Sequence, residues 1–182
     1  LSEWIHARVV DQIREVRLED LLGRAPVQIQ ERDTRPALSG KVVLVTGAGR
    51  SIGSELCRQI AGCKPSVLVG LDNAETALFH IDQQMKECFP EVQFVPELGN
   101  IQDSSRLCEI FARHEPFAVY HAAAYKHVPM MEHHPFEAVE NNVFGTANVA
   151  RASTDCGAQI FVLVSSDKAV RPANIMGATK RM

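Results

Sequence analysis

Four consecutive side chains at positions 165 to 168 are suited to proton transfer. Ser165 and Ser166 supply hydroxyls, Asp167 an acid and Lys168 a base, and such a group can donate and remove protons within one pocket. The alternative interpretation is that Asp167 and Lys168 form a solvated ion pair, worth only about 0 to 1 kcal/mol. Their position at the end of an apolar run, residues 160–166, favours the catalytic interpretation.

A second pair of informative residues follows in the segment PANIMGATKR (172–181). Met176 stands four positions before Lys180 on an expected helix. A thioether can donate no proton, so Lys180 is the group of this pair that can take part in proton chemistry.

These side chains follow an alternation of apolar strands and amphipathic helices that begins near Lys41. Strands are expected at 42–46, 67–71, 92–98, 117–124 and 160–166, with helices at 52–62, 74–88, 104–114 and 135–156. Short continuous apolar strands separated by helices predict an α/β fold, a doubly wound parallel sheet of the Rossmann type with helices on both faces. Ligands of such sheets bind beyond the carboxyl ends of the strands, where every polar motif described here falls.

The segment before this domain has a different pattern. Residues 1–22 follow a rough helical period, residues 26–30 are consistent with a short strand, and residues 31–40 form a polar linker that ends at Gly40. We therefore divide the chain into an N-terminal helix and linker at 1–39 and the α/β domain at 40–182.

The first strand runs into a glycine-rich turn, VLVTGAGRSIGSEL (43–56). A strand, a tight glycine turn and a helix allow the backbone to approach a pyrophosphate closely and to direct helical N–H groups at it. The spacing G-x-G-x-x-x-G suits short-chain dehydrogenase-like enzymes, and the alternative is a turn needed only for tight strand–helix packing. The candidate cofactor-binding residues of this loop are Gly47, Gly49, Arg50, Ser51, Ile52 and Gly53.

The type of dinucleotide depends on two opposing charges. Asp72 ends the second strand, 25 positions after Gly47, near the roughly 20-residue offset of the acid that binds the adenosine ribose. Its charge would repel a 2′-phosphate and favours NAD over NADP. Arg50 argues the other way, because a guanidinium beside the loop can pair with an extra phosphate. Asp72 can also serve as an N-terminal charge for the following helix.

Further candidate cofactor contacts follow the later strands. An amide after the third strand can read an adenine edge, small residues after the fourth let the backbone pass close to a cofactor, and Tyr125 and His127 add polar groups over the crevice. Asn142 is a candidate for orienting groups under the nicotinamide, with a buried helix-facing amide as the equal alternative. These candidates are Asn100, Ile101, Ala122, Ala123, Ala124, Lys126, Asn142 and Ser165.

Composition excludes several other classes of function. A net charge of −3 without a basic run argues against a nucleic-acid partner. Four histidines between positions 121 and 134 invite a metal hypothesis, but their spacing does not place ligands on one helical face with a carboxylate, so we expect no metal. Five scattered cysteines indicate buried thiols in a reducing compartment. No stretch approaches the roughly 20 apolar residues that span a bilayer.

Four segments together resemble the polysaccharide-biosynthesis branch of the extended short-chain dehydrogenase/reductases, and most closely its membrane-anchored, configuration-retaining UDP-N-acetylglucosamine 4,6-dehydratases. The likeness covers residues 8 to 182. The segments are TGAGRSIGSEL (46–56), HAAAYKHVPMME (121–132), ENNVFGTANVA (140–150) and SSDKAVRPANIMGATKRM (165–182).

The resemblance implies a chemistry with no net redox change. A tightly held NAD takes hydride from C4 of the sugar, water is lost across C5 and C6, and hydride returns to C6. By the same likeness Ser166 binds the C4 oxygen, Asp167 protonates the departing C6 hydroxyl and Lys168 removes the C5 proton. Methionine replaces the tyrosine of Y-x-x-x-K in the configuration-retaining subgroup, so Met176 shapes the pocket while Lys180 holds the nicotinamide ribose. The C4 proton then leaves through Ser166, water or Lys180.

The chain departs from the family's pattern at Arg50, where glycine is usual, at Ser166 and Asn100, where threonine and aspartate are commoner, and at Arg171 in place of a frequent asparagine. The family's transmembrane helices and its sugar-nucleotide subdomain are expected outside this chain. We therefore expect a soluble, cytoplasmic fragment of an inner-membrane protein whose partner is a UDP-sugar. It would form a homodimer by default, bind NAD and turn over little substrate alone.

Two other functions remain open at this level. One is a nucleotide-sugar epimerase or reductase of the same fold, against which Met176 speaks. The other is a regulatory domain that binds NAD without catalysis.

Overall fold

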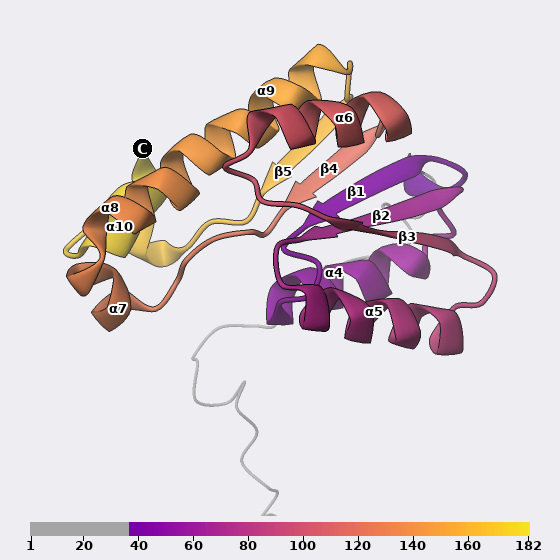
Figure 1. Ribbon diagram of the computed structural model, residues 1–182, viewed down its shortest axis with the longest axis horizontal. Coiled ribbons are helices and arrows are strands. Elements are labelled where there is room, and N and C mark those ends of the chain that lie inside the picture. Colours follow the sequence, from indigo (N-terminus) through magenta and orange to yellow (C-terminus); the bar gives the residue numbers. More distant parts are fainter. Residues whose placement is uncertain (1–36) are drawn as a thin grey trace, which may run out of the picture. The chain divides into compact units, whose positions relative to one another are not determined.

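The computed structural model describes residues 37–182. Five parallel strands form one sheet in the order β3-β2-β1-β4-β5 (Figure 1). The strands are β1 (Val42–Thr46), β2 (Val67–Asp72), β3 (Gln93–Leu98), β4 (Ala118–His121) and β5 (Ile160–Leu163). The strand order reverses between β1 and β4, so the carboxyl ends of these two strands flank the crevice in which open α/β sheets bind ligands.

Helices cover both faces of the sheet (Figure 1). On one face lie α4 (Ser51–Ala61) and α5 (Glu75–Cys88), and on the other lie α6 (Ser104–His114) and α9 (Thr146–Asp155). Alternating strand residues feed the two layers: Val43 and Val45 pack into the α4–α5 core, whereas Leu44 packs into the α6–α9 core. The predicted α/β class and the doubly wound arrangement are thus confirmed.

The segment between β4 and α9 contains three short elements. They are α7 (Val128–His133), α8 (Pro135–Val139) and a π-helical turn, η1 (Glu140–Gly145). A single helix over 135–156 is therefore wrong as a prediction, because the wider π-turn interrupts it. This turn buries Asn141 and Asn142, two adjacent residues, and π-turns of this kind occur frequently at functional sites.

The two strands that precede the polar loops are shorter than predicted. The fourth was expected to reach 124 and the fifth to reach 166, but β4 ends at His121 and β5 at Leu163. One more ladder bond joins Val164 N–H to the His121 carbonyl at 3.0 Å, and beyond it the chains diverge. The divergence frees the backbone of 164–170 to form η2 (Asp167–Ala169) and to pack on α10 (Ile175–Arg181).

The predicted N-terminal helix, the short strand at 26–30 and most of the linker lie outside the described residues. Within residues 37–182, no helix is long and apolar enough to cross a membrane.

An ionic cluster joins α6 to the edge strand β3. Glu97 is 6% exposed, and its carboxylate accepts hydrogen bonds from Arg106 at 2.7 Å and Arg113 at 2.9 Å, with His114 Nε2 at 2.8 Å. Burial by itself would raise the pKa of Glu97, but the hydrogen bond from His114 and the charges of Arg106 and Arg113 outweigh it and hold the pKa below its ordinary value. The cluster therefore stabilises the ionised carboxylate, and with it the docking of α6.

We predict that Glu97→Gln lowers the free energy of unfolding at neutral pH by about 1–3 kcal/mol, because charged hydrogen bonds to a buried acceptor are lost. Since the folded-state pKa lies below the unfolded one, this stabilisation is complete above about pH 4.3 and disappears as the pH falls through the folded pKa. The variant should lose that part of the acid dependence in urea titrations. The matched control is Glu109→Gln, whose exposed carboxylate contacts Arg106 at 3.2 Å and should cost at most about 0.5 kcal/mol. Equal losses in the two variants would contradict the assignment.

Candidate functional site

The glycine turn after β1 and the alanine segment after β4 touch at the point where the strand order reverses. Gly47 has a φ of 71°, and a Cβ there would lie 2.9 Å from the Cα of Ala123. Only glycine combines this backbone conformation with so close a neighbour. The contact is with backbone atoms of Ala122 and Ala123, and the predicted approach of the alanine segment to a cofactor stays a prediction.

Gly49 and Gly53 serve packing in the structure. A Cβ on Gly49 would lie 2.7 Å from the Cβ of Ala77 in α5, and one on Gly53 would overlap the Gly47 carbonyl. Tight packing and phosphate binding are compatible, because the turn leads directly into α4. Arg50 occupies the N-cap of α4 without a capping side-chain bond, so the first N–H groups of α4 have no side-chain acceptor from that residue and can meet an anion.

Asp72 is tied to the backbone of two loops. Its Oδ2 accepts the Gly49 N–H and its Oδ1 the Ala74 N–H, both at 2.9 Å, and its side chain is 2% exposed. The carboxylate thus joins the turn after β1 to the start of α5. The bond to the Ala74 N–H agrees with the predicted role of Asp72 at a helix N-terminus, whereas ribose binding stays a prediction.

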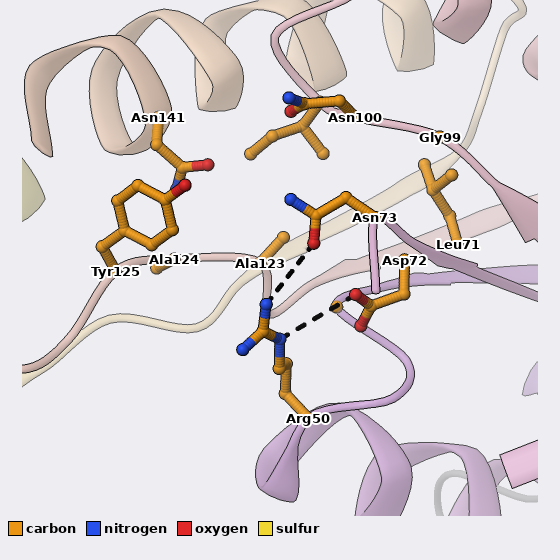
Figure 2. A pocket seen from close by; sticks show the side chains of 12 residues that line it. Arg50, Leu71, Asp72, Asn73, Gly99, Asn100, Ala123, Ala124, Tyr125 and Asn141 are labelled. Atoms are coloured by element: carbon orange, nitrogen blue, oxygen red, sulfur yellow. Dashed lines mark hydrogen bonds and ion pairs between the residues drawn. The ribbon is translucent and has the colours of Figure 1, made fainter. Parts of the chain in front are cut away.

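A first cavity lies along the carboxyl ends of β1, β2 and β4 (Figure 2). Arg50 reaches from the glycine turn towards Asp72 and Asn73, and Tyr125 and Asn141 lie across the cavity from Asp72. Asn100 lines the cavity while its Oδ1 accepts the Gln102 N–H at 3.0 Å. The lining residues are Gly47, Arg50, Leu71, Asp72, Asn73, Gly99, Asn100, Ile101, Ala123, Ala124, Tyr125 and Asn141.

A second cavity adjoins the first and shares Arg50, Ala124 and Tyr125 with it. Lys126 crosses this cavity, since its Nζ donates to the Ser51 Oγ at 3.2 Å and so links the alanine segment to the start of α4. Its lining residues are Arg50, Ser51, Ile52, Ala122, Ala124, Tyr125, Lys126, His127, Met130 and Met131. The two cavities together bring four predicted residues of the glycine turn, Asp72, Asn100, Ile101 and the alanine segment into one site, whereas Gly49 and Gly53 line neither cavity.

The two adjacent asparagines of the π-turn have different surroundings. Asn142 is 3% exposed, and its amide bonds the backbone N–H and carbonyl of Tyr125 at 2.8 and 3.0 Å and the Thr179 Oγ1 at 3.0 Å. It therefore holds the alanine segment and α10 in place. Asn141, which sequence reasoning missed, lines the first cavity instead. Only the π-turn, which has no simple sequence signal, places both residues inward.

His121 is a second residue that the sequence did not single out as part of the site. Its Nδ1 lies 2.6 Å from the Thr46 Oγ1 and its Nε2 lies 2.9 Å from the Thr146 Oγ1. Burial and the charge of Lys180 lower the pKa of His121 to about 4, so the ring is neutral near pH 7. As a neutral bridge it ties β1, β4 and α9 together behind the crevice.

The acid and base after β5 lie at the surface. Ser166 Oγ donates to the Asp167 Oδ1 at 3.0 Å and accepts the Lys168 N–H at 3.2 Å. Lys168 Nζ lies 3.7 Å from the same carboxylate, and the Asp167 side chain is 89% exposed. The hydrogen bond from Ser166, followed by the charge of Lys168, lowers the pKa of Asp167. The three residues contact one another, with Asp167 ionised, but they line neither of the two cavities, and the neighbouring Ser165 is exposed. The exposed, 3.7 Å pair of Asp167 and Lys168 matches the alternative of a solvated ion pair, so their catalytic role stays a prediction.

Met176 and Lys180 both lie on α10 but have different surroundings. Met176 is 3% exposed and packs with Met131 and Ala138 in a small apolar cluster. Lys180 Nζ donates to the Val164 carbonyl at 3.1 Å, and burial lowers its pKa. The thioether thus supports the wall of the second cavity through Met131, while Lys180 contacts the backbone that leads into the acid–base cluster.

Three residues fix the position of α10, and one of them, Gly177, contacts that cluster. Asn174 caps the helix through the Gly177 N–H at 2.7 Å, and Glu132 accepts the Ile175 N–H at 2.8 Å. A Cβ on Gly177 would overlap the Lys168 carbonyl, so the helix and η2 approach as closely as backbones can.

Among the described residues, no group of three or more His, Cys, Asp or Glu side chains is arranged to hold a metal ion.

The parallel sheet, the glycine turn at its switch point and the cavities beside it define a Rossmann-type domain with a candidate dinucleotide site. Residues 43–182 match the family described as polysaccharide biosynthesis protein. The chain belongs to this family.

Individual relatives agree with that assignment. The chain is 49% identical over 175 residues to the probable polysaccharide biosynthesis protein EpsC of Bacillus subtilis (strain 168), covering 96% of this chain and 29% of that protein. It is 44% identical over 174 residues to the capsular polysaccharide biosynthesis protein CapD of Staphylococcus aureus, covering 95% and 29%. With the inverting UDP-N-acetylglucosamine 4,6-dehydratase of Campylobacter jejuni (strain 81-176) it shares 32% identity over 143 residues, 78% of this chain and 41% of that one. The chain thus spans less than a third of EpsC and CapD.

Solved structures share the fold. Pen from Bacillus thuringiensis superposes with a TM-score of 0.72 at 30% identity, covering 79% of this chain and 43% of that one. A UDP-glucose 4-epimerase from Stenotrophomonas maltophila, solved with NAD and formylated UDP-arabinopyranose, gives a TM-score of 0.67 at 24% identity, covering 78% and 46%.

We predict that Gly177→Ala lowers the free energy of unfolding by about 1–3 kcal/mol, because the added methyl group forces η2 away from α10. Amide NMR resonances of residues 166–170 should shift in the same variant. Gly62→Ala is the matched control: Gly62 has ordinary helical angles, φ −60° and ψ −20°, and this change should stay within about 0.5 kcal/mol. If resonances 166–170 do not move in Gly177→Ala, the close approach does not position the cluster.

Proposed function

We propose that this chain is the dinucleotide-binding part of a nucleotide-sugar 4,6-dehydratase that acts on UDP-N-acetylglucosamine in surface polysaccharide synthesis. The observation that carries the proposal is the joint presence of Ser166, Asp167 and Lys168 beside a helix in which Met176 replaces a proton-donating residue. An enzyme that only moves hydride at C4 has no use for a second acid–base pair, whereas elimination of water needs both an acid and a base.

The residues present fit a nicotinamide dinucleotide. Gly47 leaves room at the switch point, the N-terminus of α4 is open to a phosphate, and the carboxylate of Asp72 lies at the position expected for ribose binding. Asn141 and Asn100 add amides to the same cavity. We propose NAD as the resident cofactor, which when bound supplies a reversible hydride acceptor.

Each member of the acid–base cluster has a distinct task. The Ser166 hydroxyl binds the C4 oxygen, Lys168 takes the C5 proton and Asp167 protonates the leaving C6 hydroxyl. Asp167 is ionised beside the charged Lys168 and its pKa is lowered, so a proton has to pass from Lys168 to Asp167 before the two can act as base and acid. A bound sugar supports this change, since burial of the carboxyl and separation from Lys168 both raise its pKa.

Lys180, on α10, supports the same acid–base chemistry. Its half-buried ammonium has a lowered pKa and lies against the Val164 carbonyl, at the start of the segment that carries the cluster. We propose that it holds a ribose hydroxyl and, with Ser166 or water, passes on the C4 proton. Met176 has no proton to transfer and keeps the α10 wall apolar.

An epimerase or reductase is the alternative, favoured by the similarity of the fold to a solved UDP-glucose 4-epimerase. Such an enzyme needs one group to exchange the C4 proton and no acid at C6. A regulatory dinucleotide-binding domain is the other alternative, and it needs neither Asp167 nor Lys168.

We predict that the intact protein, incubated with UDP-N-acetylglucosamine, forms a product lighter by one water molecule, detected by mass spectrometry. Asp167→Asn and Lys168→Met should each lower the rate by about 10²–10⁴-fold, the usual contribution of general acid–base groups. Asp155→Asn, an exposed carboxylate at the end of α9, should leave the rate unchanged. A product of unchanged mass would identify an epimerase. If the biological function of the intact protein persisted in both Asp167→Asn and Lys168→Met, the chain would be a regulatory domain.

A further inference from the structure

Arg50 places a positive charge inside the first cavity. Its Nε lies 3.8 Å from the Asp72 Oδ1, its Nη2 donates to the Asn73 Oδ1 at 3.4 Å, and its side chain is 57% exposed. Figure 2 shows the guanidinium extending from the glycine turn towards the loop after β2. The contacts are long, so the guanidinium rests beside these residues with N–H donors to spare.

The carboxylate beside it has its charge largely satisfied. Both oxygens of Asp72 accept backbone N–H groups at 2.9 Å, and its side chain is 2% exposed. Backbone N–H donors and a neighbouring guanidinium reduce the negative potential that the carboxylate projects into the cavity. The repulsion that would exclude a 2′-phosphate is therefore weaker than the presence of Asp72 alone indicates.

The cavity surface around the expected ribose position is then dominated by Arg50 and Asn73. Asn73 is exposed, and its amide nitrogen is free of hydrogen bonds to the other described residues. A guanidinium with five N–H donors, beside an amide that can also donate, matches the oxygen atoms of a phosphate.

We propose that Arg50 is a specificity-determining residue that lets the cavity accept a 2′-phosphorylated dinucleotide, so that NADP binds with an affinity within about tenfold of that of NAD. The inference rests on the proposed function in one respect, that the cavity binds a nicotinamide dinucleotide. Asp72 favours NAD, and Arg50 limits that preference.

Two other roles for Arg50 predict different behaviour. If the guanidinium bound the pyrophosphate at the N-terminus of α4, it would serve NAD and NADP equally. If it instead blocked the cavity through its contacts with Asp72 and Asn73, its removal would strengthen the binding of both. Of these three roles, only one that acts on the 2′-phosphate, by direct contact or by reducing the negative potential of Asp72, changes the ratio of the two affinities.

The test measures dissociation constants of NAD and NADP by isothermal titration calorimetry for the 182-residue chain and for Arg50→Met, which removes the charge and keeps an unbranched side chain. We expect the ratio Kd(NADP)/Kd(NAD) to rise about tenfold in Arg50→Met, as for loss of one partly exposed charged hydrogen bond. In Arg50→Lys, which keeps the positive charge, the ratio Kd(NADP)/Kd(NAD) should lie between the values of the unsubstituted chain and of Arg50→Met. The fragments 5′-AMP and 2′,5′-ADP, which differ only in the 2′-phosphate, should show the same change in ratio.

Lys126→Met is the matched control, because Lys126 is a cation of the same site that contacts Ser51 rather than the loop after β2. It should weaken both dinucleotides by the same factor and leave the ratio unchanged. Since Arg50 is exposed, Arg50→Met should unfold at the same temperature as the unsubstituted chain.

The outcomes separate the inference from the proposed function. If NAD binds but the ratio is the same in Arg50→Met, whether both affinities fall, rise or stay, the inference is overturned and the proposed function stands. If neither dinucleotide binds the unsubstituted chain, both are overturned.

Discussion

The site depends on one steric constraint, the contact between the turn after β1 and the segment after β4. Gly47 and Ala123 meet there with no room for a further carbon atom. The contact is possible because the strand order reverses between these two strands, so their loops leave the sheet towards opposite faces and open a crevice. The glycine turn, the alanine segment and the start of α4 all take their positions from it.

Hydrogen bonds to the backbone turn that crevice into a site with defined walls. Asp72 holds the glycine turn to the start of α5, and Asn142 holds the alanine segment to α10. Both side chains are almost completely buried, where an unsatisfied polar group is costly and a satisfied one specifies a single arrangement. Their neighbours in sequence or space, Asn141 and Arg50, line the first cavity.

The acid–base cluster has the opposite character. Ser166, Asp167 and Lys168 are bonded to one another at the surface, and the pKa of Asp167 is lowered in that state. Beneath them, α10 is fixed by Glu132, Asn174 and the close approach at Gly177. Because Asp167 is exposed above a fixed helix, its protonation state depends on what covers the cluster.

Local sequence determined the elements and their order, because apolar runs of strand length, amphipathic helices and the glycine turn each form from residues close along the chain. The boundaries of β1 and α6 follow from such signals. Tertiary structure alone decided the early ends of β4 and β5, the π-turn that turns Asn141 rather than Asn142 to the cavity, and the neutral His121 bridge. These depend on contacts between residues 17 to 75 positions apart, such as Tyr125 with Asn142 and His121 with Thr46, which no local pattern specifies.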